Sequence, residues 1–328
     1  MATRYAKVHE TPAGPGDARP TASQILQDEG LAGKWQERVV MITGCSSGLG
    51  VETARVLSTT GCTLYLTARD LDKAKTALGD LAQSDRVHLL ELDLNSLASV
   101  RACAAEFNKR SSKLNVLIEN AGVMMAPEGR TVDGFETHFG INHLAHLLLF
   151  ELLKPTLLAS STAEFNSRVI ILASIGHRSA EVNFEDLNYA ENYHPWMGYG
   201  ASKTANVWTA SQIERLYGPQ GLHAWSIQPG PTATGLYKHV SEAEVAASAS
   251  DPALGRIFKT LEQGAATTVW GATAAALEGQ GGKYLEDCQI SKQWDPSGGQ
   301  WAPGSAPWAY DEEKMAKLWA KSLELVGL

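Results

Sequence analysis

The sequence is poor in the features that mark metal sites and disulfide scaffolds. Its 328 residues include only four cysteines, Cys45, Cys62, Cys103 and Cys288, and these form no Cys-x-x-Cys pair and no zinc spacing. A disulfide framework or a structural zinc site needs closely patterned cysteines. We therefore expect reduced thiols in a cytoplasmic setting, no metal, and a buried packing role for Cys45.

Long apolar runs and a surplus of positive charge are also missing. The longest apolar candidate, residues 144–159, is interrupted by His146, Glu151, Lys154 and Pro155, so it falls short of the ~18 residues that cross a bilayer. We expect a packed helix there, no signal peptide and no membrane anchor. The net charge of −8 leaves no basic surplus to displace counterions, so nucleic-acid binding is not expected.

The sequence does contain the alternation of an α/β protein. Hydrophobic residues at 44% and charged residues at 20% are typical of a globular domain. Strands are predicted at 38–42, 63–67, 87–92, 114–118, 168–173, 224–228 and 283–285, and helices at 51–58, 71–82, 97–109, 132–159, 199–217 and 265–277. This order predicts one Rossmann-like, doubly wound α/β domain. Its seven-stranded, mostly parallel sheet would carry helices on both faces.

A glycine-rich turn, residues 43–50 (TGCSSGLG), follows the first predicted strand. Gly44 allows a tight turn, Gly48 lets the backbone approach a pyrophosphate, and Gly50 lets helix and strand pack closely. The following helix start would offer unpaired N–H groups to phosphates. A turn without a ligand is the alternative. The flanking strand and helix favour a dinucleotide site that also includes Ser46, Ser47 and Leu49.

The stretch at 199–203 (YGASK) places a phenol and an ammonium four residues apart, on one helix face. A phenol titrates near ~10, and a neighbouring cation favours its ionised form. Tyr199 and Lys203 are therefore candidates for acid/base chemistry. Taken alone, such a pair is more often an ordinary surface feature.

Taken together, the motifs resemble the short-chain dehydrogenase/reductase superfamily from about Lys34 to the C-terminus. They are Gly44-x-x-x-Gly48-x-Gly50, Asn120-Ala121-Gly122, Asn142, Ser174, Tyr199-x-x-x-Lys203 and Pro229-Gly230. Residues 93–100, 142–146, 282–284 and 311–319 resemble the retinol-dehydrogenase-like branch more closely.

The resemblance implies a set of catalytic roles. Tyr199 would exchange a proton with the alkoxide, and Lys203 would lower the pKa of Tyr199 and hold the nicotinamide ribose. Ser174 would polarise the substrate oxygen, and Asn142 would hold a water that links Lys203 to solvent. A cap at a turn is the alternative for Ser174, and a helix-interior amide bound to backbone is the alternative for Asn142.

The residues at the end of the second predicted strand bear on the choice between NAD and NADP as cofactor. An acidic residue there selects NAD, whereas an arginine accommodates the 2′-phosphate of NADP. The resemblance implies that Ala68 holds the acid position and that Arg69 stands where NADP-preferring relatives keep a basic residue. NADP is therefore expected over NAD, although Asp70 lies beside Arg69. The resemblance assigns the adenine to Asp93 and Leu94, and the cofactor ribose to Asn120, Ala121 and Gly122. Contacts to the carboxamide or pyrophosphate are assigned to Pro229, Gly230, Thr232 and Thr234.

The chain outside these motifs divides into three further segments. Residues 1–33 are rich in Pro and Gly and are expected to form a partly ordered arm, with a floppy tail as the alternative. The catalytic domain, residues 34–328, would include a substrate lid at about 235–258 and a covering segment at about 286–328. The sequence leaves monomer and homodimer open.

Aromatic residues near the catalytic motifs suggest a bulky, apolar carbonyl or alcohol as substrate. The candidate pocket residues are Ile175, His177, Tyr193, Trp196, Leu236 and Tyr237, although each aromatic alone is as readily explained by packing. The sequence thus predicts an NADP(H)-dependent ketoreductase or alcohol dehydrogenase. Imine or enone reduction on the same scaffold is an alternative, and so is a catalytically idle NADP(H) sensor.

Overall fold

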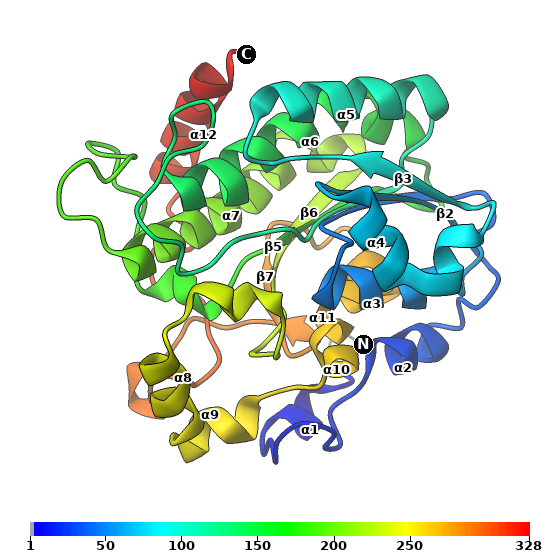
Figure 1. Ribbon diagram of the computed structural model, residues 1–328. Helices are drawn as coiled ribbons and strands as arrows, with labels where there is room; N and C mark the ends of the chain where they lie inside the picture. Colours follow the sequence, from blue (N-terminus) through cyan, green and yellow to red (C-terminus); the bar gives the residue numbers. More distant parts are fainter. Residues whose placement is uncertain (1–2) are drawn as a thin grey trace.

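The computed structural model describes residues 3–328, apart from the side chains of residues 247–249. The first two residues of the expected N-terminal extension lie outside the described residues, as do three side chains of the expected lid. The centre of the molecule is one sheet flanked by helices on both faces (Figure 1). The predicted fold class is confirmed.

The strands follow the doubly wound order β3-β2-β1-β4-β5-β6-β7-β8, and all neighbouring pairs are parallel except β7 and β8. Their bounds are β1 Val39–Thr43, β2 Thr63–Ala68, β3 Val87–Glu91, β4 Val116–Glu119, β5 Ser167–Leu172, β6 Leu222–Gln228, β7 Tyr284–Glu286 and β8 Gln289–Ile290. Every residue of β1, β4, β5 and β6 is buried. Strands covered on both faces have continuous apolar sequences, which explains why these strands were predictable.

The eighth strand is a correction to the predicted seven. It pairs antiparallel with β7 across Asp287 and Cys288, which have φ angles of 51° and 52°. Two consecutive left-handed residues make the turn of a tight hairpin. Glycine or asparagine usually marks such a turn, so an Asp-Cys pair gave no signal in the sequence.

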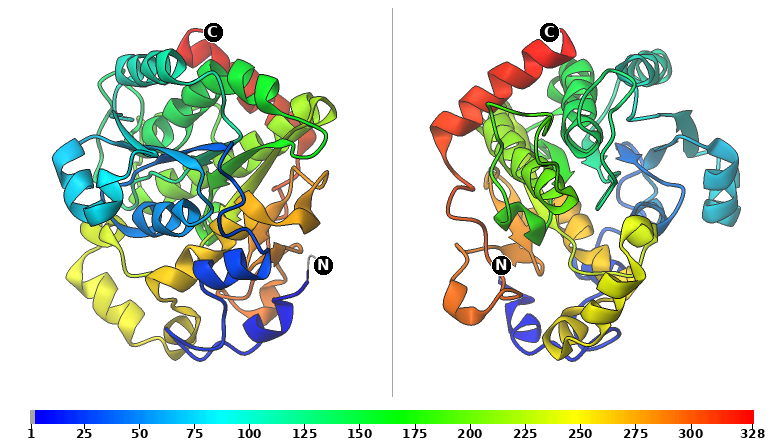
Figure 2. Two further views of the ribbon diagram at one scale, coloured as in Figure 1. Left: turned by 90° about the vertical axis from the view of Figure 1, so that its right-hand side faces the viewer. Right: turned by 60° about the vertical axis from the view of Figure 1, so that its left-hand side comes forward.

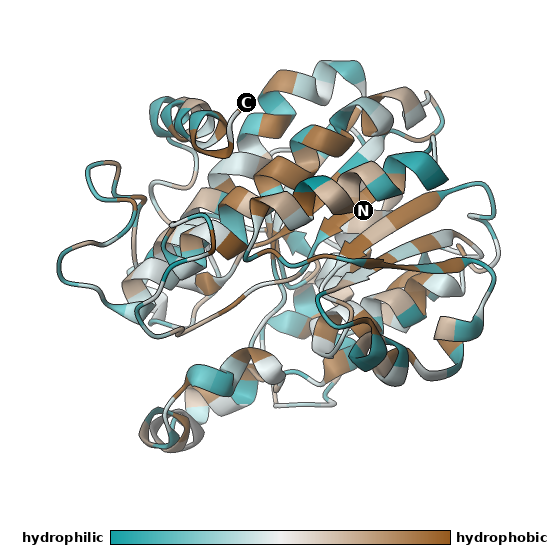
Figure 3. Cartoon of the chain, turned by 45° about the horizontal axis from the view of Figure 1, so that its top comes forward, coloured by the Kyte–Doolittle hydropathy of each residue, from teal (hydrophilic) through white to brown (hydrophobic). Residues whose placement is uncertain are grey.

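Two layers of helices cover the sheet (Figure 2). The helices α5 (Leu97–Arg110), α6 (Ala145–Ser160), α7 (Pro195–Tyr217) and α12 (Glu312–Val326) share one hydrophobic cluster. On the other face lie α2 (Ala22–Asp28), α3 (Gly48–Ser58), α4 (Leu71–Leu78) and α11 (Ala266–Thr273). Hydrophobic residues concentrate on the strands, and hydrophilic residues on the outer loops (Figure 3).

Several helix boundaries differ from the predictions. The helix expected at 51–58 begins at Gly48, and the helix expected at 265–277 ends at Thr273. The helix expected at 132–159 begins only after a short bridge between Arg130 and Glu136. It then contains a π-helical turn, η2 (Phe139–Leu144), before α6. The helix α7 begins four residues before Tyr199, because His194 caps it and Pro195 fits its first turn. The helix expected at 71–82 ends at Leu78, where Gly79 has a φ of 58°.

The short helices lie together at one end of the molecule (Figure 1). They are α1 (Ala6–His9), α8 (Glu242–Ala249), α9 (Pro252–Ile257) and α10 (Leu261–Gly264). In the N-terminal arm, defined here as residues 3–33, Thr21 caps α2, and Ile25 and Leu26 are buried in the core. The four cysteines are unpaired and buried, and burial raises the pKa of the Cys45 thiol. Within residues 3–328, no helix has the length and apolar character needed to cross a membrane.

Candidate active site

The glycine turn between β1 and α3 forms one end of a deep cavity. Gly44 and Gly48 have φ angles of 77° and 64°, which side chains other than glycine rarely adopt. A Cβ atom at Gly50 would lie 2.4 Å from the Gly44 carbonyl oxygen and 2.6 Å from the Asn120 amide nitrogen. Ser47 precedes α3 without a side-chain cap, so the helix start is left with N–H groups for an anion. The residues of this turn therefore fit a dinucleotide pyrophosphate.

The cavity has a volume of about 910 Å³ and lies at the carboxyl ends of β1, β4, β5 and β6. The structure brings most of the predicted site residues to its lining. They are Gly44, Ser46, Ser47, Gly48, Leu49, Arg69, Asn120, Ala121, Gly122, Ser174, Ile175, Trp196, Tyr199, Lys203, Pro229, Gly230, Thr234, Leu236 and Tyr237. Gly50, Asp93, Leu94, Asn142, His177, Tyr193 and Thr232 are not part of this lining.

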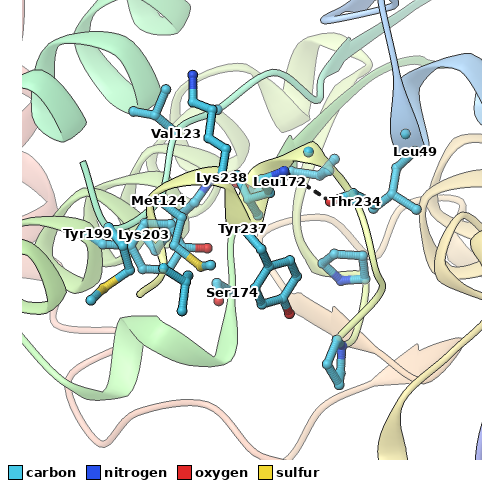
Figure 4. Close-up of a pocket in the computed structure, with 18 of the residues that line it drawn as sticks. Leu49, Val123, Met124, Leu172, Ser174, Tyr199, Lys203, Thr234, Tyr237 and Lys238 are labelled. Atoms are coloured by element: carbon cyan, nitrogen blue, oxygen red, sulfur yellow. Dashed lines mark hydrogen bonds between the residues drawn. The ribbon is translucent and has the colours of Figure 1, made fainter. Parts of the chain in front are cut away.

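Tyr199 and Lys203 project from α7 toward Ser174, which follows β5 (Figure 4). The Lys203 ammonium lies 5.7 Å from the centre of the Tyr199 ring and donates to the Leu172 carbonyl oxygen at 2.8 Å. The Ser174 oxygen accepts a hydrogen bond from the Gly176 N–H at 3.0 Å. Ser174 therefore caps this turn, which was the alternative role considered for it. The cap uses the Ser174 oxygen as an acceptor and does not use its hydroxyl proton. Ser174 also forms a side-chain hydrogen bond with Tyr199.

Burial dominates the protonation of this group of side chains. It raises the pKa of the Tyr199 hydroxyl, with Ser174 acting in the opposite direction. It lowers the pKa of Lys203 to about 7. The neighbouring cation was predicted to lower the pKa of Tyr199. In the protein without a ligand, the loss of hydration on burial has the larger effect and raises that pKa. Tyr199 is a protonated donor at neutral pH.

Asn142 lies in the π-helical turn and is fully buried. Its side-chain amide donates to the Val123 carbonyl oxygen and to Ser202 Oγ, both at 3.0 Å, and its oxygen accepts from the Val123 N–H at 2.8 Å. The Asn142 amide thus bonds to backbone groups, which was the alternative role considered for this residue. These bonds hold Val123 directly after Asn120-Ala121-Gly122, so Asn142 positions the lining of the cavity.

The end of β2 presents two cations to the cavity. Arg69 and Lys73 both line it. The Asp70 carboxylate between them accepts from the Lys73 N–H at 2.9 Å and caps α4. Asp70 is therefore committed to the helix. Lys73 was missed by the sequence analysis, although its position one turn after Arg69 was a signal that could have identified it.

His177 and Tyr193 serve the structure around the cavity. His177 is fully buried, its Nδ1 lies 2.6 Å from the Ser174 carbonyl oxygen, and its Nε2 accepts from the Ala306 N–H at 2.9 Å. Burial lowers its pKa to about 4, so the ring is neutral and joins Ser174 to the C-terminal segment. The Tyr193 hydroxyl donates to the Ala126 carbonyl oxygen at 2.7 Å.

Three residues that were expected near the cofactor, Asp93, Leu94 and Thr232, make local contacts within the protein. Asp93 accepts from the Asn95 N–H, and Leu94 is buried in the core. The Thr232 hydroxyl donates to the Gly230 carbonyl oxygen at 3.2 Å. Within the described chain, no group of His, Cys, Asp and Glu side chains is placed to hold a metal ion.

Several apolar residues that were not among the candidate pocket residues line the substrate end of the cavity, and four of them belong to the expected lid at 235–258. The whole set is Met124, Met125, Val240, Leu254, Ile257, Phe258 and Trp301. They come from three distant segments of the chain, and Met125 has a φ of 53°. Trp196 lies with its ring centre 5.7 Å from that of Tyr199. This end of the cavity therefore suits an apolar ligand whose polar group meets Ser174 and Tyr199.

Comparison with known proteins gives one consistent result. Residues 38–245 match the family model for short chain dehydrogenases. The chain is 45% identical over 325 residues to short-chain dehydrogenase/reductase prx1 of Penicillium roqueforti, covering 99% of this chain and 95% of that protein. It is 36% identical over 295 residues to retinol dehydrogenase 12 of Mus musculus, covering 89% and 87%. Among solved structures, the RhlG/NADP complex of Pseudomonas aeruginosa superposes with a TM-score of 0.61 at 25% identity, covering 76% and 93%.

Proposed function

The chain belongs to the short-chain dehydrogenase/reductase family, in its retinol-dehydrogenase-like branch, and on this premise we propose its reaction. The protein is an NADP(H)-dependent ketoreductase that interconverts the carbonyl and the secondary alcohol of a bulky, apolar small molecule. The observation that carries the proposal is the convergence of Ser174, Tyr199 and Lys203 on one cavity. That cavity continues to the start of α3.

The proton path follows from the hydrogen bonds of these residues. Ser174 donates its hydroxyl proton to the substrate oxygen in a hydrogen bond and polarises the carbonyl. When bound, NADPH supplies the hydride that the carbonyl carbon accepts. Tyr199 then donates its phenolic proton to the alkoxide oxygen. Lys203, fixed by the Leu172 carbonyl, supplies positive charge beside the phenolate that remains.

The charges at the end of β2 support NADP rather than NAD. Discrimination between the two depends on the 2′-position of the adenosine ribose, where NADP carries a phosphate. Arg69 offers a guanidinium charge and Lys73 an ammonium charge there, and the Asp70 carboxylate between them caps α4. The NADP named in the RhlG complex agrees with this preference.

The lining of the substrate end supports a bulky, apolar ligand. Met124, Trp196 and Leu254 offer apolar surface, and the relatives include an enzyme named for an apolar alcohol, retinol. Methionine adapts to ligand shape because its side chain is unbranched and polarizable.

We further propose that residues 235–258 close over the ligand as a lid, and that the protein works in the cytoplasm without a metal. The unpaired, buried cysteines agree with a reducing compartment. Monomer and homodimer remain alternatives that a measurement of mass in solution would separate.

The decisive test measures NADPH oxidation with a panel of apolar ketones, in the wild type and in Tyr199→Phe. We expect turnover by the wild type and its near-complete loss in Tyr199→Phe, with NADPH affinity within about threefold, because the ring is retained and only the proton donor is lost. Tyr217→Phe is the matched control, because it removes a phenolic hydroxyl from the last residue of the same helix, outside the cavity lining. Normal turnover by Tyr199→Phe would refute the mechanism. NADPH binding with no turnover in either protein would indicate a cofactor sensor instead.

A further inference from the structure

A second cavity, of about 330 Å³, lies beside the substrate end of the first. Its walls come from the N-terminal arm, from α9 and the residues after it, and from the C-terminal segment. The two cavities share six lining residues: Ile175, Gln228, Gly230, Pro231, Ile257 and Trp301. Ile175 lies in the segment after β5, Gln228 is the last residue of β6, and Gly230 and Pro231 lie in the loop after β6. Only Ile257 and Trp301, here called the partition, come from the covering segments.

Trp301 is held in place at its ring and at its backbone. The indole Nε1 donates to the Asp251 carboxylate at 2.7 Å. The Arg178 guanidinium donates to the carbonyl oxygens on either side of it, Gln300 at 2.6 Å and Ala302 at 2.7 Å. Arg178 lies four residues after Ser174, so the indole is fixed relative to the catalytic serine.

Ile257 is held from the opposite end of the chain. It is the last residue of α9, and the Arg19 guanidinium donates to the carbonyl oxygens of Ile257 at 2.8 Å and Phe258 at 2.6 Å. The Arg19 side chain is only 3% exposed and pairs with Asp17. The other end of α9 is capped by Asp251, the residue that accepts from Trp301. Both members of the partition therefore belong to one hydrogen-bonded unit.

Most of the buried charged groups around the second cavity are paired, whereas Glu10 and Arg256 are exposed to solvent. The Lys259 ammonium, with its side chain 2% exposed, donates to Asp287 at 2.8 Å and to the Pro229 carbonyl oxygen at 3.1 Å. Glu286 accepts a short hydrogen bond from Ser291. A neutral group that entered this space would not have to separate an ion pair. The second cavity can therefore receive an apolar extension of a ligand.

We propose that Trp301, together with Ile257, is a specificity-determining residue that sets the maximum length of the substrate. The partition ends the substrate site of the wild type, so the substrate class is a bulky apolar carbonyl compound of limited length. Removing the indole joins the two cavities and admits longer molecules. That the ligand is a carbonyl compound which is reduced rests on the proposed function. The limit on its length rests on the partition between the two cavities.

The test compares Trp301→Ala, Trp301→Phe and Ile257→Ala with the wild type on aryl alkyl ketones whose alkyl chain lengthens one methylene at a time. In Trp301→Ala we expect kcat/KM for the longer ketones to rise about tenfold, since each accommodated methylene changes discrimination by about that factor. The shortest ketone and the KM for NADPH should change by less than about threefold. Trp301→Phe, which keeps most of the bulk, should retain the wild-type limit.

Trp294→Ala is the matched control, because Trp294 lies in the same segment, packs against Arg178 and lines neither cavity. It should leave the length limit unchanged. If Trp301→Ala does not fold, Ile257→Ala removes the other half of the partition and carries the test. Folded partition variants that still reject long ketones would overturn the proposal, and so would a wild type without a length limit.

A second readout separates this proposal from the proposed function. Secondary alcohols of the same lengths, added with NADPH, bind without reacting, and their binding raises the Tm of the ternary complex. For each protein, the longest alcohol that still raises the Tm gives the length limit. A shorter limit in the wild type than in Trp301→Ala supports the proposal, even if no ketone is reduced. Equal limits in both proteins would overturn it. Absence of ketone reduction by the wild type would count against the proposed function alone.

Discussion

Replacing Gly50 by alanine tests the close packing on which the cofactor end of the site depends. The new methyl group would lie 2.4 Å from the Gly44 carbonyl oxygen and 2.6 Å from the Asn120 amide nitrogen. That amide donates to the Thr43 carbonyl oxygen at 2.8 Å and thereby ties β4 to β1. To relieve the overlap, either α3 must move away from the glycine turn or this hydrogen bond must break.

The expected cost follows from these two contacts. Overpacking a tight site costs about 1–3 kcal/mol, and weakening one buried hydrogen bond adds about 1 kcal/mol. We therefore expect Gly50→Ala to lower the free energy of unfolding by about 2–4 kcal/mol and to lower the Tm by several degrees. NADPH affinity should fall as well, because the helix start moves relative to the phosphates.

The assay is thermal and urea unfolding with and without NADPH. Gly255→Ala in α9 is the matched control, since a Cβ atom there meets nothing within 4 Å and its φ is not in the left-handed region. This control should leave stability unchanged or raise it by about 0.5–1 kcal/mol. A Gly50→Ala protein with wild-type stability and wild-type NADPH affinity would refute the reasoning.

Two further predictions concern charge. Arg69→Ala should weaken NADPH binding about tenfold, as measured by fluorescence titration, and leave NADH binding within about twofold, because only NADPH carries the 2′-phosphate; equal losses would contradict the proposed preference. Burial raises the pKa of Glu119 from 4.5 to about 8, so between these values the folded protein binds more protons than the unfolded chain and loses stability as pH rises. Glu119→Gln should remove this part of the pH dependence, giving a smaller decrease in the urea midpoint from pH 5 to pH 8. An unchanged slope in the variant would show that Glu119 is ionised in the folded protein.

The sequence was sufficient for those parts of the fold that are encoded locally. The buried strands were predictable because parallel strands covered on both faces need continuous apolar runs, as in β1 and β5. The start of α7 was missed because His194, a less usual capping residue, takes the place of serine or aspartate. The strand β8 was missed because its turn uses Asp287 and Cys288 in a conformation usually left to glycine or asparagine.

The residues of the candidate site also fall into two groups, those that a local motif identifies and those that only the folded chain brings together. Residues in motifs, such as Gly44 and Tyr199, were found because their chemistry requires fixed local spacing. Trp301 and Leu254 line the same cavity, but they are brought there by tertiary packing that no local pattern encodes. The protonation of Tyr199 and Lys203 also depends on tertiary structure, because the depth of burial sets the balance between hydration and charge.

The attachment of α9 to both ends of the chain has a consequence for biosynthesis. The elements that would hold the cofactor lie between residues 39 and 234, so they leave the ribosome before the segment that contains Trp301. Until Trp301 emerges, Asp251 has no indole to bind. The end wall of the substrate chamber is therefore the last part of the site that synthesis can complete.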